Sequence, residues 1–262
     1  MIIDTHTHIY PDKIATRAAR TIGEYYEMPM GYDGTAANLI KTGTAAGIDK
    51  FVVCSVATLP TQVRNINKFI AKSVEESDGR FWGYGTLHPD CEDIPALVDE
   101  IIALGLVGVK IHGDFQRFDI DSPAAMRLYE CIENRLPLLT HSGDYRTGYT
   151  KPARVVNIAR AFPKLDIIAA HMGGWSEWGS HAAELAEFGV YVDTCSSLYA
   201  VKPRFAKLLI ETFGTDKVFF GTDYPMWRAK KELEYIGNLH LSDSEREGIL
   251  SGNFLRFISK YE

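Results

Sequence analysis

Short apolar runs recur eight times along this chain, with helical segments between them, and this alternation limits the possible folds more than any other feature. Each run is short and mostly apolar, as expected for parallel strands that are buried on both faces. Strand–helix alternation at this spacing predicts a parallel sheet covered by helices. The runs span residues 2–6, 51–55, 81–86, 106–111, 136–141, 166–171, 190–194 and 218–222.

The segments between the runs carry helix signals. Ser122-Pro123 predicts an N-cap followed by proline at the first helical position, and Pro203 opens another helix that Gly214 ends. Eight such units in 262 residues favour an α/β fold, a closed (β/α)₈ TIM barrel that forms a single domain over residues 1–262. An open doubly wound sheet is the alternative, but no G-x-G-x-x-G follows an early strand. The long segment 10–34 is expected to form a lid or pocket wall, or helical padding.

Composition narrows the range of partners. The net charge is −6 and no basic stripe stands out, so we expect no nucleic-acid partner. No apolar run approaches the roughly 20 residues of a membrane span, and the first residues lack the features of a signal peptide. The four cysteines are scattered without a C-x-x-C pair, which is typical of reduced thiols. These features predict a cytoplasmic protein that does not associate with membranes, and they leave open whether it forms a homo-oligomer.

Two histidines end the first predicted strand, in His6-Thr7-His8. Residues i and i+2 of a strand point to the same side, so both imidazoles share one face. If the barrel closes, that face can lie at the carboxyl end of the strand, where active sites of this fold are found. An H-x-H pair alone is a weak signal, but two histidines at one strand end make half of a metal site.

Three further polar residues follow other strands. His141 ends the fifth run, His171 ends the sixth, and Asp223 follows the eighth. Each alone is more often a capping or core residue than a ligand. Together with His6 and His8 they fall at the same edge of one predicted barrel, whereas residues placed by chance would be distributed along the strands and helices. The pattern therefore predicts a metal-dependent active site.

With these residues the chain resembles the amidohydrolase superfamily, and within it the amidohydrolase-related family that includes aminocarboxymuconate-semialdehyde decarboxylase and resorcylate decarboxylases. The resemblance covers nearly the whole chain. It implies that His6, His8, His141 and Asp223 bind one divalent metal, and that His171 is the acid/base beside it. The segments that carry it are Asp4-Thr5-His6-Thr7-His8, Gly108-Val109-Lys110-Ile111-His112, Thr140-His141-Ser142-Gly143, Ala170-His171-Met172-Gly173-Gly174, Gly221-Thr222-Asp223-Tyr224-Pro225 and Gly252-Asn253-Phe254-Leu255-Arg256.

The chemistry of these residue types agrees with that implication. Three neutral imidazoles and one carboxylate suit Zn²⁺ best, with Mn²⁺ and Fe²⁺ as alternatives. A metal lowers the pKa of bound water from 15.7 toward about 7. Asp223 can accept a proton from such a water, and an unligated His171 can polarise the substrate or move a proton.

Substrate contacts are predicted on the neighbouring strand ends and loops. Lys110 and His112 share a face at the end of the fourth run. Lys110 can bind a substrate carboxylate, pair with an acid at the barrel rim, or be carboxylated and bridge two metals, which we rank third. Arg117 and Arg146 can clamp a carboxylate of a small-molecule substrate, although each alone is more often a solvated surface residue. Trp175 can form an apolar wall or pack its own loop.

Four functions compete. The first is a hydrolase, in which metal-activated water attacks an ester, lactone or amide carbonyl. The second is a metal-dependent non-oxidative decarboxylase of a small carboxylic acid, aromatic acids included; the same ligands serve both. The chain is shorter than most decarboxylases that it resembles, so we favour hydrolysis slightly. A TatD-like deoxyribonuclease fits less well, because that family has a glutamate where this chain has Lys110. A non-catalytic binding protein would be expected to lack one or two of the metal-binding residues, and none of them is missing from this chain.

Overall fold

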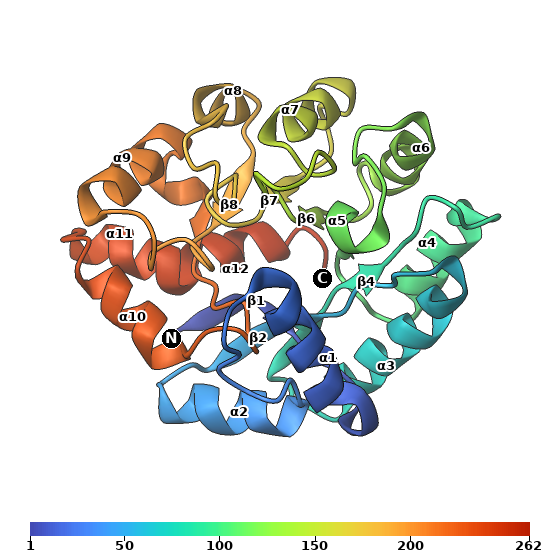
Figure 1. The fold of residues 1–262 in the computed structure, drawn as a ribbon, viewed down its shortest axis with the longest axis horizontal. Coiled ribbons are helices and arrows are strands. Elements are labelled where there is room, and N and C mark those ends of the chain that lie inside the picture. Colours follow the sequence, from blue (N-terminus) through green and yellow to red (C-terminus); the bar gives the residue numbers. More distant parts are fainter.

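The computed structural model describes residues 1–262 and shows parallel strands at all eight predicted places, ringed by helices (Figure 1). The strands are short, because each supplies only a few residues to the barrel wall. Their bounds are β1 (Ile3–His8), β2 (Lys50–Cys54), β3 (Phe81–Gly83), β4 (Gly85–Thr86), β5 (Val109–Ile111), β6 (Leu138–Thr140), β7 (Ile167–Ala169), β8 (Tyr191–Asp193) and β9 (Val218–Phe219).

All pairings are parallel and follow chain order, β1-β2-β3 and then β4 to β9. The last strand returns to the first: the Thr5 amide donates to the Phe220 carbonyl (2.9 Å), and the Asp223 amide donates to the His6 carbonyl (2.9 Å). This closure confirms the predicted (β/α)₈ barrel and rejects the open sheet. It also places Asp223 directly beside the His6–His8 segment.

The third predicted strand, residues 81–86, differs from the prediction because it is divided at Tyr84 into β3 and β4. The Tyr84 ring is fully buried in the barrel interior. It lies against Gly108, where an added Cβ atom would come within 2.6 Å of the ring. The wall therefore bends where a large side chain turns inward, and the glycine on the neighbouring segment makes room for it.

The helices surround the barrel and begin where the sequence signals predict. Ser122 caps its helix by accepting from the Ala125 amide, and Gly214 follows the helix that Pro203 opens. The segment predicted as a lid, wall or padding forms a 15-residue helix, α1. The helices are α1 (Asp12–Tyr26), α2 (Ala36–Ala45), α3 (Val63–Glu75), α4 (Ile94–Ala103), α5 (Gly113–Gln116), α6 (Pro123–Ile132), α7 (Pro152–Ala161), α8 (Ala182–Glu187), α9 (Pro203–Phe213), α10 (Ala229–Gly237), α11 (Asp243–Glu247) and α12 (Asn253–Ile258), with short turns of helix at Pro60–Gln62, Thr215–Lys217 and Gly248–Gly252.

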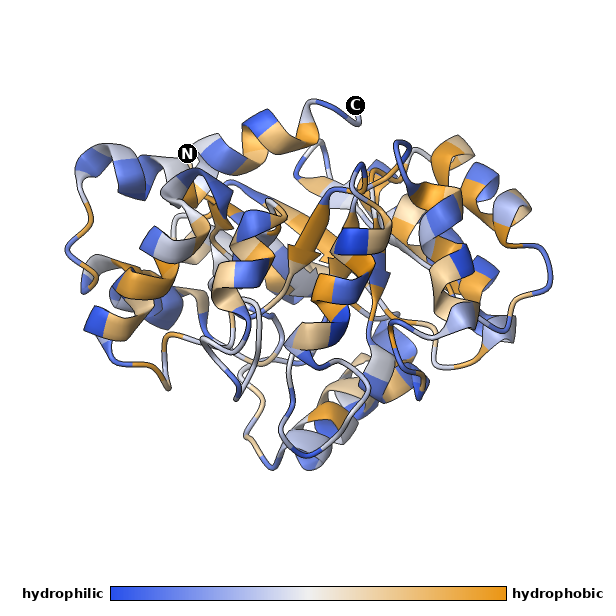
Figure 2. Ribbon diagram, turned by 90° about the horizontal axis from the view of Figure 1, so that it is seen from above, coloured by the Kyte–Doolittle hydropathy of each residue, from blue (hydrophilic) through white to orange (hydrophobic).

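Apolar side chains fill two layers, one between strands and helices and one inside the barrel. Figure 2 shows the hydrophobic colour concentrated on the strands and on the inner faces of the helices, and both termini at the same end of the molecule. Phe254 and Phe257 of α12 join the inner layer and plug the amino end of the barrel. The predicted metal-binding residues lie at the other, carboxyl end of the barrel. None of the helices combines the length and apolar character that crossing a bilayer requires.

Candidate functional site

His6, His8 and Asp223 bring three metal-binding atoms together at the carboxyl end of the barrel. The Nε2 atoms of His6 and His8 lie 3.2 Å apart, as their shared face of β1 predicts. The Oδ1 atom of Asp223 lies 3.4 Å from Nε2 of His8 and 4.0 Å from Nε2 of His6. Asp223 is held there by its backbone bond to β1 and by Ser196, whose hydroxyl donates to Oδ2 (2.5 Å).

His141 and His171 follow β6 and β7 and extend this cluster. Nε2 of His171 lies 2.9 Å from Nδ1 of His141, and the His171 ring stacks on that of His6 with centroids 5.4 Å apart. The other ring nitrogen of His141, Nε2, is buried without a hydrogen-bond partner. All five residues predicted as ligands or acid/base therefore gather at one place. Their possible ligand atoms form two groups within 4.8 Å, one of His6, His8 and Asp223 and one of His6, His171, Asp193 and Cys195.

Asp193 and Cys195 lie behind the cluster and fix its orientation. Oδ2 of Asp193 accepts from Nδ1 of His6 (2.8 Å), so the lone pair of His6 Nε2 faces the barrel mouth. Oδ1 of Asp193 accepts the backbone N–H of His171 (2.9 Å) and the Cys195 thiol (3.0 Å). Burial would raise the pKa of Asp193, but the charge and hydrogen bond of His6 lower it to about 2.

Burial keeps most of the imidazoles neutral. Burial and the Lys110 cation lower the pKa of His6 to about 4. Burial also lowers the pKa values of His141 and His171. Burial would lower the pKa of His8, but Cys54 and Asp223 raise it to about 9. Burial would raise the pKa of Asp223, but the hydrogen bond from His8 and nearby histidines hold it well below its usual range.

The donor set fits a divalent metal. Nε2 of His6, Nε2 of His8 and Oδ1 of Asp223 lie 3.2–4.0 Å from one another. Nε2 of His141 is a further buried nitrogen without a hydrogen-bond partner, although it lies 3.9 Å from Oδ2 of Asp114. Nitrogen and oxygen ligands of this kind are those that Zn²⁺ and Mn²⁺ take in proteins.

Lys110 and His112 line the side of the cluster. Lys110 is fully buried, and its ammonium group contacts Nε2 of His6 (3.0 Å). No carboxylate lies within 4 Å of it, so a pairing with a rim acid is absent from the structure. His112 stacks on His141 with centroids 4.0 Å apart, and its Nε2 contacts the Tyr26 hydroxyl of α1 (3.1 Å).

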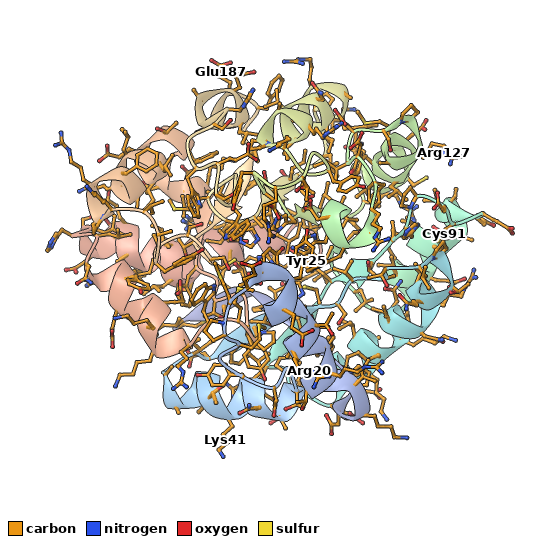
Figure 3. All side chains as sticks on the ribbon, viewed as in Figure 1. Arg20, Tyr25, Lys41, Cys91, Arg127 and Glu187 are labelled. Carbon is orange, nitrogen blue, oxygen red and sulfur yellow. The ribbon has the colours of Figure 1, made fainter.

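A cavity of about 790 Å³ opens onto the cluster. It is a plausible size for a small-molecule site, since such pockets commonly span about 300–1,000 Å³. Trp175 forms part of its wall, as predicted, and Tyr26 packs edge-on against that ring with centroids 5.1 Å apart. Figure 3 shows the neighbouring Tyr25 over the middle of this barrel face, while Lys41, Arg127 and Glu187 lie at the rim.

The two arginines predicted as a carboxylate clamp are not among the residues that line the cavity. Arg146 is held by Asp144, to which its Nε and Nη2 donate (2.9 and 2.7 Å), and by the Tyr25 carbonyl (2.9 Å). Its guanidinium also lies over the Tyr25 and Trp175 rings. Arg117 is exposed in a left-handed turn (φ 61°) after α5. Arg146 therefore braces α1 against the barrel.

Sequence reasoning missed Tyr26, Asp193, Cys195 and Ser196. Asp193 lies near the end of the seventh run, and Cys195 and Ser196 directly follow that run, in Asp193-Thr194-Cys195-Ser196. The rule that found the other site residues, polar side chains at the carboxyl ends of strands, would have included them. Tyr26 carries no such signal, because only the path of α1 over the barrel brings it to His112.

Comparisons with known proteins agree with this architecture. The sequence model of the Amidohydrolase family matches residues 3–258. A 2-amino-3-carboxymuconate-6-semialdehyde decarboxylase of Dictyostelium discoideum is 25% identical over 236 residues, which cover 74% of this chain. The match covers 65% of that relative, so this chain accounts for slightly less than two thirds of its length.

Two solved structures show the same fold. An uncharacterized TIM-barrel protein from Bordetella bronchiseptica superposes with a TM-score of 0.82 at 19% identity, covering 99% of both chains. A 5-carboxyvanillate decarboxylase from Novosphingobium aromaticivorans, solved with bound manganese and 3-methoxy-4-hydroxy-5-nitrobenzoic acid, superposes with a TM-score of 0.78 at 16% identity. That alignment covers 99% of this chain and 97% of the decarboxylase.

Proposed function

Since this chain belongs to the amidohydrolase family, we propose that it is a metal-dependent enzyme that removes a carboxyl group from a small acid without oxidation. The observation that carries the proposal is Lys110, a fully buried cation with no carboxylate partner, on the wall of the cavity that holds the histidine cluster. A buried charge without a partner is costly, so an anionic ligand is its natural counterpart. The similarity to decarboxylases supports this choice over hydrolysis, which the sequence analysis slightly favoured.

In this proposal His6, His8, His141 and Asp223 hold one divalent metal. Zinc is our first candidate because of the imidazole-rich donor set, and manganese is the second because a structurally similar decarboxylase was solved with it. A metal bound there would hold an oxygen of the substrate and withdraw electron density from the carbon skeleton. Asp193 keeps the Nε2 lone pair of His6 directed at the site through its hydrogen bond to Nδ1.

Burial lowers the pKa of His171 and leaves it neutral between turnovers, so in this account it takes up a proton from water and delivers it to the substrate carbon. When the bond to the carboxyl group breaks, carbon dioxide leaves and the electron pair stays on the carbon, which then needs one proton. His171 lies at the edge of the cluster with Nε2 turned toward His141. Lys110 would hold an anionic group that remains on the product, because a cation held on the departing carboxylate would stabilise the substrate more than the transition state.

The reaction can be identified with a panel of hydroxylated aromatic acids and a panel of esters, lactones and amides, using the metal-loaded protein in D₂O containing H₂¹⁸O. Decarboxylation predicts a product that has lost carbon dioxide and carries one deuterium on the carbon. Incorporation of ¹⁸O into a new carboxyl group, without release of carbon dioxide, would show hydrolysis instead and would overturn the proposed reaction. We also propose that the enzyme works in the cytoplasm.

A further inference from the structure

The cavity does not end at the metal-binding cluster but continues outward between α1 and α3. Ile14 and Ile22 of α1 line one side of this extension, and Ile66 and Phe69 of α3 line the other. Figure 1 shows α1 crossing the open face of the barrel beside α3. We call this part of the cavity, defined by these four side chains, the α1–α3 groove.

The apolar side chains of the groove are free to contact a ligand, because α1 packs on the barrel through small residues. Its buried positions are Ala15, Ala19 and Gly23. Ile14 and Ile22 lie two helical turns apart on the cavity side, and 42% of the Ile14 surface is exposed. A helix that leaves its large apolar residues half exposed in a cavity suits an apolar ligand better than water.

A cation stands on the groove wall as well. Arg17 lines the cavity and has no carboxylate within 4 Å, whereas Arg20, one turn further along α1, pairs with Glu24 at 3.6 Å. Arg17 is the one arginine and Lys110 the one lysine that line the cavity, and Asp223 is its one acidic side chain. The cavity therefore offers a positive charge at the metal end and another beside the apolar groove.

From this arrangement we propose that the groove is a second substrate subsite, which takes an apolar chain or ring that ends in an anionic group held by Arg17. Besides the carboxyl group that is lost, the elongated substrate then carries anionic groups at both ends, one at Lys110 and one at Arg17. This inference rests on the proposed function for the Lys110 end. The volume of about 790 Å³ supports it, because it lies toward the upper end of the range for small-molecule pockets.

Calorimetric titration of the metal-loaded protein tests the subsite with two series of probes. The first series runs from butyrate to laurate, and the second contains the α,ω-dicarboxylates of the same lengths. Affinity should rise by up to about fourfold for each methylene group that enters the groove. Once the chain is long enough to reach Arg17, the dicarboxylate should bind about tenfold more tightly than the monocarboxylate of equal length.

Two variants have matched controls. Arg17→Gln should remove the advantage of the long dicarboxylates, while Arg20→Gln should keep it. Ile14→Ser, at a groove position with 42% of its surface exposed, should reduce the gain in affinity with chain length. Ile102→Ser, which replaces an isoleucine on α4 with a similar exposed fraction (41%), should not.

The outcomes separate this inference from the proposed function. In one outcome, Lys110→Met abolishes the binding of short acids, but affinity does not rise with chain length. The subsite in the α1–α3 groove is then wrong, and the role of Lys110 as the anchor for an anionic group stands. If affinity rises with length and depends on Arg17 while Lys110→Met changes nothing, the subsite stands and the anchor is wrong. An advantage of long dicarboxylates that survives Arg17→Gln would remove Arg17 from the proposal.

Discussion

Nε2 of His171 lies 2.9 Å from Nδ1 of His141 at the carboxyl ends of two adjacent strands. This contact leaves the other nitrogen of His141, Nε2, without a hydrogen-bond partner. The two rings can therefore divide the work, since His141 can bind a metal through Nε2 while His171 carries a proton. In our proposal His141 is the ligand and His171 is the proton carrier. The assignment predicts different results for the loss of each side chain.

His171→Asn should retain nearly normal metal content and lose activity by about 10²–10⁴-fold, the usual contribution of general acid–base catalysis. His141→Ala should lose metal, because it removes a ligand. Atomic spectroscopy and turnover are to be measured on both variants, with activities compared at equal metal occupancy. If His171→Asn loses its metal as completely as His141→Ala does, His171 is itself a ligand. If it keeps both metal and full turnover, the proton must come from another residue, with His112 next in line.

Asp193→Asn should weaken metal binding by about 10–100-fold, a typical effect of removing the partner that orients a ligating histidine. The carboxylate accepts from Nδ1 of His6, and an amide can present its NH₂ group there instead. Asp166→Asn is the matched control, because Asp166 bonds Lys260 and Tyr261 away from the cavity. A dissociation constant for Mn²⁺ that is equal in the two variants would show that Asp193 does not position His6.

Lys110→Met should raise KM for an acid substrate by about tenfold or more, since it removes the buried cation while keeping an apolar stem of similar length. Arg117→Ala should leave KM unchanged, because Arg117 is exposed and does not line the cavity. This expectation replaces the arginine clamp suggested by the sequence. A KM that rises in Arg117→Ala and stays constant in Lys110→Met would restore that clamp.

Glu232 should make the protein less stable as the pH rises. It lies on α10 with both carboxylate oxygens buried and unpartnered. Burial, together with the charges of Asp4 and Asp223, raises its pKa from 4.5 to about 8. Between these values the folded chain keeps a proton that the unfolded chain has released, so stability falls across this window.

Glu232→Gln should therefore raise the melting temperature at pH 9 by about 3 °C or more and change it little at pH 5. Thermal unfolding of both proteins at the two pH values checks this. A difference that is the same at pH 5 and pH 9 would mean that the carboxyl group titrates normally.

The architecture could be predicted from the sequence because each barrel strand has a local sequence pattern, a short apolar run followed by a helix signal. The same regularity predicted that His6, His8, His141, His171 and Asp223 would meet, since the strands of a parallel barrel share one carboxyl edge. Their roles stay predictions, because gathering at one place does not distinguish a ligand from a proton carrier.

Features that depend on tertiary contacts could not be predicted. From the sequence, an arginine on a βα loop is a candidate for binding a substrate carboxylate. The structure shows instead that Arg146 donates to Asp144 and to the Tyr25 carbonyl. Tyr26 reaches His112 only because α1 crosses the barrel face. The division of the third strand follows from the inward turn of Tyr84, which its apolar run does not reveal.

The metal content of the purified protein tests the central claim most directly. We predict about one divalent metal per chain, bound by His6, His8, His141 and Asp223, with activity that is lost on chelation and restored by Zn²⁺ or Mn²⁺. The measurement combines elemental analysis with an intact-mass determination that would detect a carboxylated Lys110. Two metals per chain together with carboxylated Lys110 would replace the one-metal site with a binuclear one, and full activity in metal-free protein would contradict the account altogether.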